Sequence, residues 1–160
     1  MGKLNLISKE EFILEGVFEK FTIPSNAILD VEKAKKAIEN YKTDKVDKGL
    51  SLGYLNEGFL LMPTDDGEQV VEEDKDPAFM VTDIWFSDED KTISGQIILL
   101  DTTDGIKVKN ALLQGIECYV SNANIDIYPT TEKNQAVVKM AVGEIKGFNI
   151  SLMNFHSTQF

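Results

Sequence analysis

Strand-like segments that follow one another directly dominate the sequence, and their order most constrains the fold. Residues 79–86 (FMVTDIWF) and 92–100 (TISGQIILL) are rich in β-branched and aromatic residues. Only the polar turn at 87–91 separates them. They therefore predict an antiparallel hairpin, because neighbouring parallel strands need a crossover of about a dozen residues or more. Residues 12–23 predict another strand, with a bulge at Gly16.

The last third of the chain also predicts strands. Residues 116–128 indicate one strand, or two strand segments joined at 122–124. Residues 135–142 and 144–155 predict a closing hairpin that turns at Gly143. Residues 50–62 form a shorter apolar segment, which Gly53 and Gly58 interrupt.

Two segments have the period of a helix. In residues 30–42 the apolar side chains recur at spacings of three and four, and Asp30 is a suitable N-cap. We expect this helix to end within residues 43–49. A second helix is predicted to begin at Asp101–Asp104 and to stop at Gly115.

The resulting order, β-α-β-β-β-α-β-β-β, favours a mainly β (α+β) fold. Most strands follow each other without a helix, so the order is typical of an antiparallel sheet that closes into a barrel or forms a sandwich. We expect a closed or nearly closed antiparallel barrel with two outer helices. The 160 residues suit a single domain, 1–160.

The charge of the chain excludes several partners. The formal net charge is −11, and all 16 cationic side chains are lysines. Such a chain is repelled by nucleic acids and by anionic membranes, and it lacks the arginine fork that grips phosphate. No long apolar stretch opens the sequence, so we expect a cytoplasmic protein with neither signal peptide nor membrane anchor.

Residues 63–77 are strongly acidic. Their only cation is Lys75, and seven acids accompany it: Asp65, Asp66, Glu68, Glu72, Glu73, Asp74 and Asp76. Charge repulsion predicts a solvated, mobile loop. A calcium loop is the alternative, but the spacing lacks the alternating acidic ligands that such loops use.

Few residues suit catalysis or metal binding. Cys118 and His156 are the only cysteine and the only histidine, which excludes an intrachain disulfide, a cysteine zinc site and a multi-histidine metal site. We expect no cofactor. Cys118 is expected to be a buried strand residue on the face opposite to Ser121, three residues on. His156 lies four residues from the C-terminus of the sequence, where a role as general base is not expected.

Five segments occur in an order that resembles a known family. They are EGVFEKF, LGYLNEG, VTDIWFSDEDKTISGQIILL, DGIKVKNALLQG and IECYVSNANI. The arrangement resembles the capsid-maturation (prohead) serine proteases of tailed phages, whose fold is shared with the herpesvirus assemblins. In that family an L-G-E-L-(N/D)-H-P segment holds the catalytic histidine, and a strand ending in V-S-S-R-G holds the nucleophilic serine. The resemblance covers residues 15–154.

Position by position, the resemblance implies two site residues. Leu52–Asn56 matches the histidine segment, but Glu57 stands where the family has its histidine and Gly58 replaces the proline. Val120-Ser121 matches the serine segment, so Ser121 occupies the nucleophile position. Asn122–Asn124 replaces the S-R-G that helps the family stabilise the oxyanion. No residue can be matched to the third triad member.

These departures predict a protease-fold protein without peptidase activity. A serine hydroxyl needs a base, and a carboxylate with an ordinary pKa of about 4.3 is a far weaker base than imidazole. The resemblance then implies a structural or scaffold-associated role in capsid assembly, in the host cytoplasm or in the virion. Its partners would be capsid, scaffold or core proteins, and a homo-oligomer is compatible with this role. Two alternatives stay open: an active prohead endopeptidase with Glu57 or a lysine as base, or an acidic β-domain that binds another protein through residues 63–77.

Overall fold

The computed structural model describes residues 2–56, 76–130 and 137–153. These residues form eight strands, two α-helices and one π-helical turn. In chain order they are β1 (Gly2–Ser8), β2 (Ile13–Lys20), β3 (Ala27–Leu29), α1 (Val31–Tyr41), η1 (Lys42–Val46), β4 (Leu52–Leu55), β5 (Phe79–Ser87), β6 (Thr92–Leu99), α2 (Thr103–Leu113), β7 (Glu117–Thr130) and β8 (Val138–Met153).

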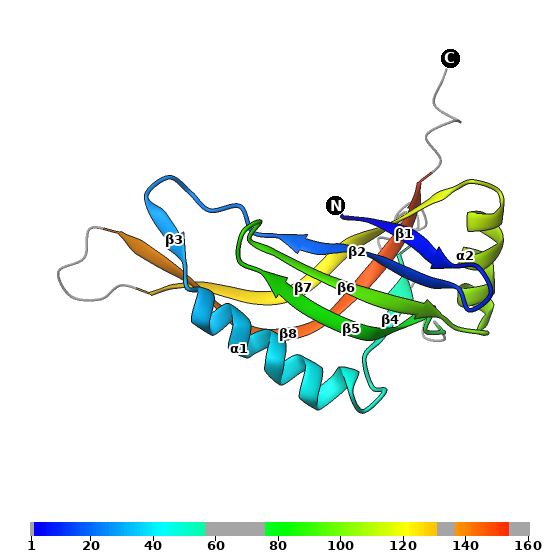
Figure 1. The fold of residues 1–160 in the computed structure, drawn as a ribbon, viewed down its shortest axis with the longest axis horizontal. Helices are drawn as coiled ribbons and strands as arrows, with labels where there is room; N and C mark the ends of the chain where they lie inside the picture. Colours follow the sequence, from blue (N-terminus) through cyan, green and yellow to red (C-terminus); the bar gives the residue numbers. More distant parts are fainter. Residues whose placement is uncertain (1, 57–75, 131–136, 154–160) are drawn as a thin grey trace, which may run out of the picture.

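Seven of the strands close into a barrel (Figure 1). Their order is β8-β4-β5-β6-β2-β1-β7, and β7 pairs again with β8 to complete the ring. The predicted mainly β barrel with two helices is therefore confirmed. The sheet is mixed rather than wholly antiparallel, because β3 and β4 both run parallel to β8. The helix α1 and the turn η1 provide the crossover that lets β4 return parallel to β3.

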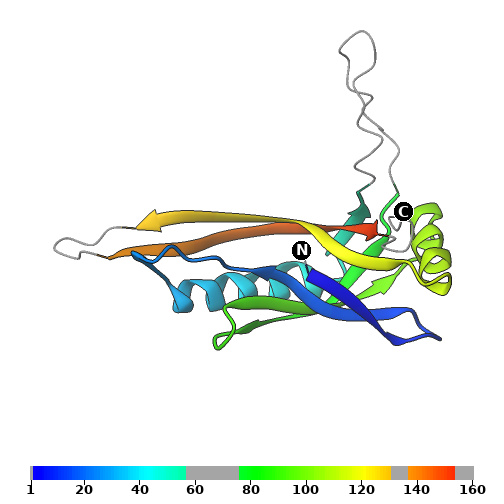
Figure 2. The ribbon, with the colours of Figure 1, turned by 90° about the horizontal axis from the view of Figure 1, so that it is seen from above.

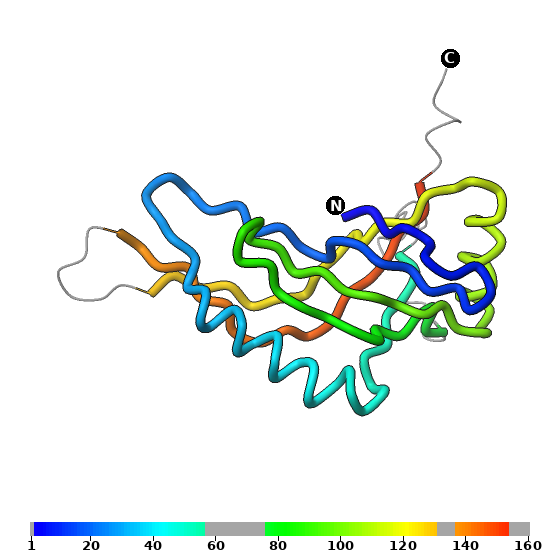
Figure 3. The backbone as a smooth tube through the Cα atoms, viewed as in Figure 1, coloured from blue at the N-terminus to red at the C-terminus, as the bar shows by residue number. Residues whose placement is uncertain are grey.

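The two last strands form one long hairpin, and this corrects the prediction of a turn at Gly143. β7 and β8 pair from Glu117↔Met153 to Thr130↔Lys139, and Gly143 lies inside β8. A Cβ at Gly143 would lie 3.2 Å from the Tyr128 ring and 3.3 Å from Asp126 Cβ. The glycine thus serves close packing against β7 rather than a turn. Figures 2 and 3 show this hairpin extending beyond the barrel alongside β3 and α1.

The N-terminal half differs from the prediction in two places. The strands β1 and β3 were not predicted; β1 has seven residues and β3 only three. The bulge in β2 lies between Val17 and Glu19, not at Gly16, which keeps regular pairing with Leu4 and Gly95. The first helix ends within residues 43–49, as predicted, because η1 continues it by a π-helical turn to Val46.

Both helices begin where the sequence predicts. The Asp30 carboxylate accepts a hydrogen bond from Lys33 N–H at 3.1 Å, and Thr102 Oγ1 accepts one from Gly105 N–H at 3.0 Å. Gly115, with φ of +86°, ends the second helix as expected. The apolar face of α1, with Ala34 and Ile38 buried, covers the barrel next to β8 and β5.

A buried hydrogen bond joins α1 to the segment that leads into β4. The Tyr41 hydroxyl and Ser51 Oγ contact each other, and both residues are buried. Tyr41→Phe should lower the free energy of unfolding by about 1–3 kcal/mol, because Ser51 Oγ would lose its partner while staying out of water. Urea denaturation tests this. Adding Ser51→Ala to Tyr41→Phe should recover part of the loss, and a further loss of stability would contradict the assignment.

Candidate functional site

The two segments that match the family's histidine and serine segments come together on either side of one strand. Leu55 of β4 pairs with Ile150 of β8, and Val120 of β7 pairs with the same Ile150 from the other side. Leu55, Val120 and Ile150 all point into the core. The residues that follow Leu55 and Val120 in the chain are therefore placed within two strand spacings, about 10 Å, of each other.

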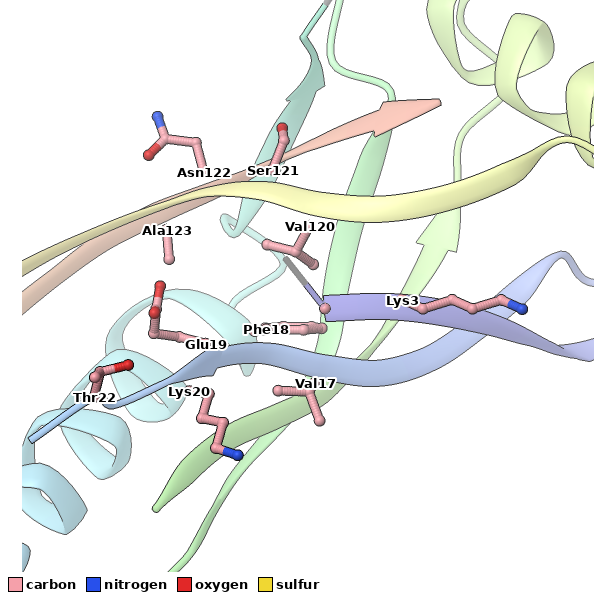
Figure 4. Close-up of a pocket in the computed structure, with 11 residues that line it drawn as sticks. Lys3, Val17, Phe18, Glu19, Lys20, Thr22, Val120, Ser121, Asn122 and Ala123 are labelled. Atoms are coloured by element: carbon pink, nitrogen blue, oxygen red, sulfur yellow. The ribbon is translucent and has the colours of Figure 1, made fainter. Parts of the chain in front are cut away.

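Ser121 sits at a β-bulge. The register of β7 on β8 shifts between Val120 and Asn122, so Ser121 is the extra residue. Bulges re-aim side chains and are common beside active sites. Figure 4 shows the Ser121 and Asn122 side chains on the outer side of β7, with Val120 and Ala123 on the inner side. Ser121 is half-buried, and its hydroxyl donates a long hydrogen bond of 3.5 Å to Asn149 O.

Hydrogen bonds between β4 and β8 fix the other side of the site. Tyr54 N–H donates to Asn149 Oδ1 at 3.2 Å, and Asn56 N–H donates to Ile150 O at 2.7 Å. Ser151 Oγ then donates to Asn56 O at 3.2 Å. Asn149 thus lies between the two matched segments, since its carbonyl accepts from Ser121 and its side chain accepts from Tyr54.

No base contacts the Ser121 hydroxyl within the part of the chain that the structure describes. Its hydrogen-bond partner, Asn149 O, is a backbone carbonyl, which cannot take its proton. Glu57 and His156 lie outside the described residues, as do most of residues 63–77, so the roles given to Glu57 and to the acidic loop stay predictions.

The ionisable groups next along β7 are already engaged. Glu117 accepts hydrogen bonds from Lys3 Nζ at 3.0 Å and from the Tyr119 hydroxyl at 2.5 Å. The hydrogen bond to Glu117 is the main cause that raises the pKa of Tyr119. Tyr119 therefore keeps its proton near neutral pH and is not a base for Ser121.

Cys118 lies in the core, on the face of β7 opposite to Ser121, as predicted. Burial raises the pKa of its thiol to about 12. Thiolate is the reactive form, so Cys118 is a structural residue and not a nucleophile. Within residues 2–56, 76–130 and 137–153, no three acidic, histidine or cysteine side chains are grouped to hold a metal ion. No helix in those ranges is both long and apolar enough to span a membrane.

Comparisons with known proteins show a likeness to a solved structure. No protein-family model matches the chain, and neither does any curated protein. Among solved structures, the chain is similar to that of the bacteriophage T4 capsid assembly protease, gp21, with a TM-score of 0.49 and 17% sequence identity. The alignment covers 88% of this chain and 79% of the other.

The sequence did not reveal two features of this region. The bulge at Ser121 depends on the register of β7 on β8, and no local residue pattern marks it. A cavity beside Ser121 is formed by β2 and β7, which are about a hundred residues apart in the sequence.

Proposed function

We propose that the chain is a protease-fold protein of tailed-phage capsid assembly that acts as a structural or scaffold-associated component without peptidase activity. The main support for this proposal is a feature of the sheet. The segments that match the family's histidine and serine motifs both pair with β8 at Ile150. The sequence separates these segments by more than sixty residues, so their meeting is independent of the motifs themselves. This placement supports the resemblance that the motif order suggests.

The absence of activity follows from the chemistry of the matched positions. Glu57 stands where imidazole would remove the serine proton, and Asn122-Ala123-Asn124 stands where the family's oxyanion segment would be. Losing a triad base costs about 10⁴ to 10⁶ in rate. Losing an oxyanion donor costs about a further 10² to 10³.

Ser121→Ala should therefore change nothing in a cleavage assay. The purified chain is incubated with phage capsid and scaffold proteins, and products are followed by mass spectrometry beside the Ser121→Ala variant. We expect identical product profiles and no adduct on Ser121 after treatment with a serine-directed phosphonate. Cleavage that depends on Ser121, or a phosphonate adduct at Ser121, would overturn the proposal of an inactive protein.

The same experiment addresses the alternative of an active endopeptidase. The outward placement of Ser121 at a bulge favours this alternative, because the hydroxyl is not sealed in the core. If cleavage depends on Ser121, the Glu57→Gln variant distinguishes the two candidate bases, Glu57 and a lysine. Loss of activity identifies Glu57 as the base, and retained activity points to a lysine. Direct association with capsid or scaffold proteins, measured by co-sedimentation, tests the structural role separately.

A further inference from the structure

The edge of β7 that faces β1 is largely unpaired. β1 pairs with β7 only at Cys118, Tyr119 and Val120, whereas β7 continues to Thr130. Along residues 122–130, the side away from β8 has no strand partner among the described residues. An unpaired edge presents backbone N–H and C=O groups that can pair with another extended chain.

A cavity adjoins the start of this free edge. It has a volume of about 710 Å³ and lies between β2 and β7, beyond the first residue of β1 (Figure 4). Its walls are residues 17–20 and Thr22 on one side and residues 120–123 on the other, with Gly2 and Lys3 at one end. The cavity is large enough for one long side chain together with part of a peptide backbone.

A carboxylate points into this cavity. The Glu19 side chain extends from β2 toward β7, where the facing side chain is the methyl group of Ala123 (Figure 4). No side chain within the described ranges forms a hydrogen bond or an ion pair with it. Burial is the main cause that raises the pKa of Glu19, while the positive charge of the N-terminus and a hydrogen bond from the Lys20 backbone N–H lower it in part. Of the two lysines lining the cavity, Lys20 points away and Lys3 is engaged by Glu117.

We propose that the β7 edge and this cavity bind an extended basic peptide segment of a partner protein. The segment adds to β7 from Asn122 onward, and one lysine or arginine side chain enters the cavity to pair with Glu19. A cationic ligand suits both this carboxylate, which no described side chain pairs with, and the net charge of −11, which attracts basic partners. This inference does not depend on the catalytic status of Ser121 or on a role in capsid assembly.

The test uses a blocked hexapeptide with the sequence Val-Thr-Lys-Thr-Val-Thr and two versions in which glutamate or norleucine replaces lysine. Binding to the whole chain is followed by NMR, at low salt and at peptide concentrations up to about 1 mM. The lysine peptide should shift the amide signals of residues 19–22 and 121–124. The glutamate and norleucine peptides should bind about tenfold more weakly or not at all.

Protein variants locate the charge contact. Glu19→Gln should weaken binding of the lysine peptide about tenfold and make it equal to that of the norleucine peptide. Ala123→Lys should abolish binding, because the new side chain fills the cavity and pairs with Glu19. Glu11→Gln is the matched control: it removes an exposed carboxylate in the turn that precedes β2 and should leave binding unchanged.

Four results of the peptide experiments would overturn the proposal. They are no binding of the lysine peptide, equal binding of all three peptides, unchanged binding to the Glu19→Gln variant, and signal shifts confined to other strands. Self-association of the chain through β7, detected by sedimentation, would also overturn it, since a second copy would then occupy the edge.

Discussion

Phe148→Ala is expected to lower the free energy of unfolding by about 3–5 kcal/mol. Phe148 of β8 is only 4% exposed, and its ring packs against two others. Its centroid lies 4.9 Å from that of Phe18 in β2 and 5.9 Å from that of Tyr41 in α1. The substitution removes a large buried apolar surface and leaves a cavity where the barrel meets the helix. The two effects add to the loss of folding free energy.

Denaturation in urea measures this effect. Phe148→Leu should cost clearly less, because leucine fills part of the same volume, and Ile127→Ala at an exposed position of β7 should change stability by less than about 0.5 kcal/mol. The slope of the free energy against urea should stay unchanged if the fold is kept. A loss of about 1 kcal/mol or less for Phe148→Ala would show that this side chain is not at the centre of the core.

The same substitution bears on the candidate site. Asn149, the next residue, accepts hydrogen bonds from Ser121 and Tyr54. Because Phe148 anchors this part of β8 to the core, its loss should loosen the contact between β7, β8 and β4. The geometry around Ser121 thus depends on packing on the opposite face of the strand.

Local signals allowed the helices and the β5–β6 hairpin to be predicted. Asp30 and Thr102 cap their helices, and Gly115 adopts a positive φ, all of which depend on a few neighbouring residues. The short polar turn between Ser87 and Thr92 likewise sets the hairpin without help from the rest of the chain. Barrel closure could be inferred from the order of strands, because few helices were available for crossovers.

Features that depend on distant residues could not be predicted in the same way. Glycine is a typical turn residue, yet Gly143 lies inside a strand and packs against Tyr128 of the neighbouring strand. The parallel pairing of β4 with β8 and the bulge at Ser121 are set by register across the sheet. The position of Ser121 on the outer face was predictable from its spacing to Cys118. Its hydrogen bond to Asn149 was not, because that contact depends on the pairing of β7 with β8.

The glycine of the Glu15-Gly16-Val17 segment has a steric role in the barrel. A Cβ at Gly16 would lie 2.2 Å from Lys3 O and 3.1 Å from Lys3 C, both backbone atoms of β1. On its other side Gly16 pairs with Gly95 of β6. Backbone atoms of a paired strand cannot swing aside as a flexible side chain can, so any larger residue must push β1 away from β2.

Gly16→Val should therefore lower the free energy of unfolding by about 3 kcal/mol or more. Displacing β1 would also break its pairing with β7 and separate Lys3 from Glu117. Urea denaturation gives the loss of stability, and hydrogen exchange should show the amides of β1 exchanging faster than those of β5 and β6.

Gly147→Ala in β8 is the matched control for Gly16→Val. A Cβ at Gly147 meets nothing within 4 Å, so this variant should stay within about 0.5 kcal/mol of the original stability. If Gly16→Val were as stable as Gly147→Ala, β1 would not be held tightly against β2. The ring of strands would then not be closed by β1, and the free edge assigned to β7 would begin before Cys118 rather than after Val120.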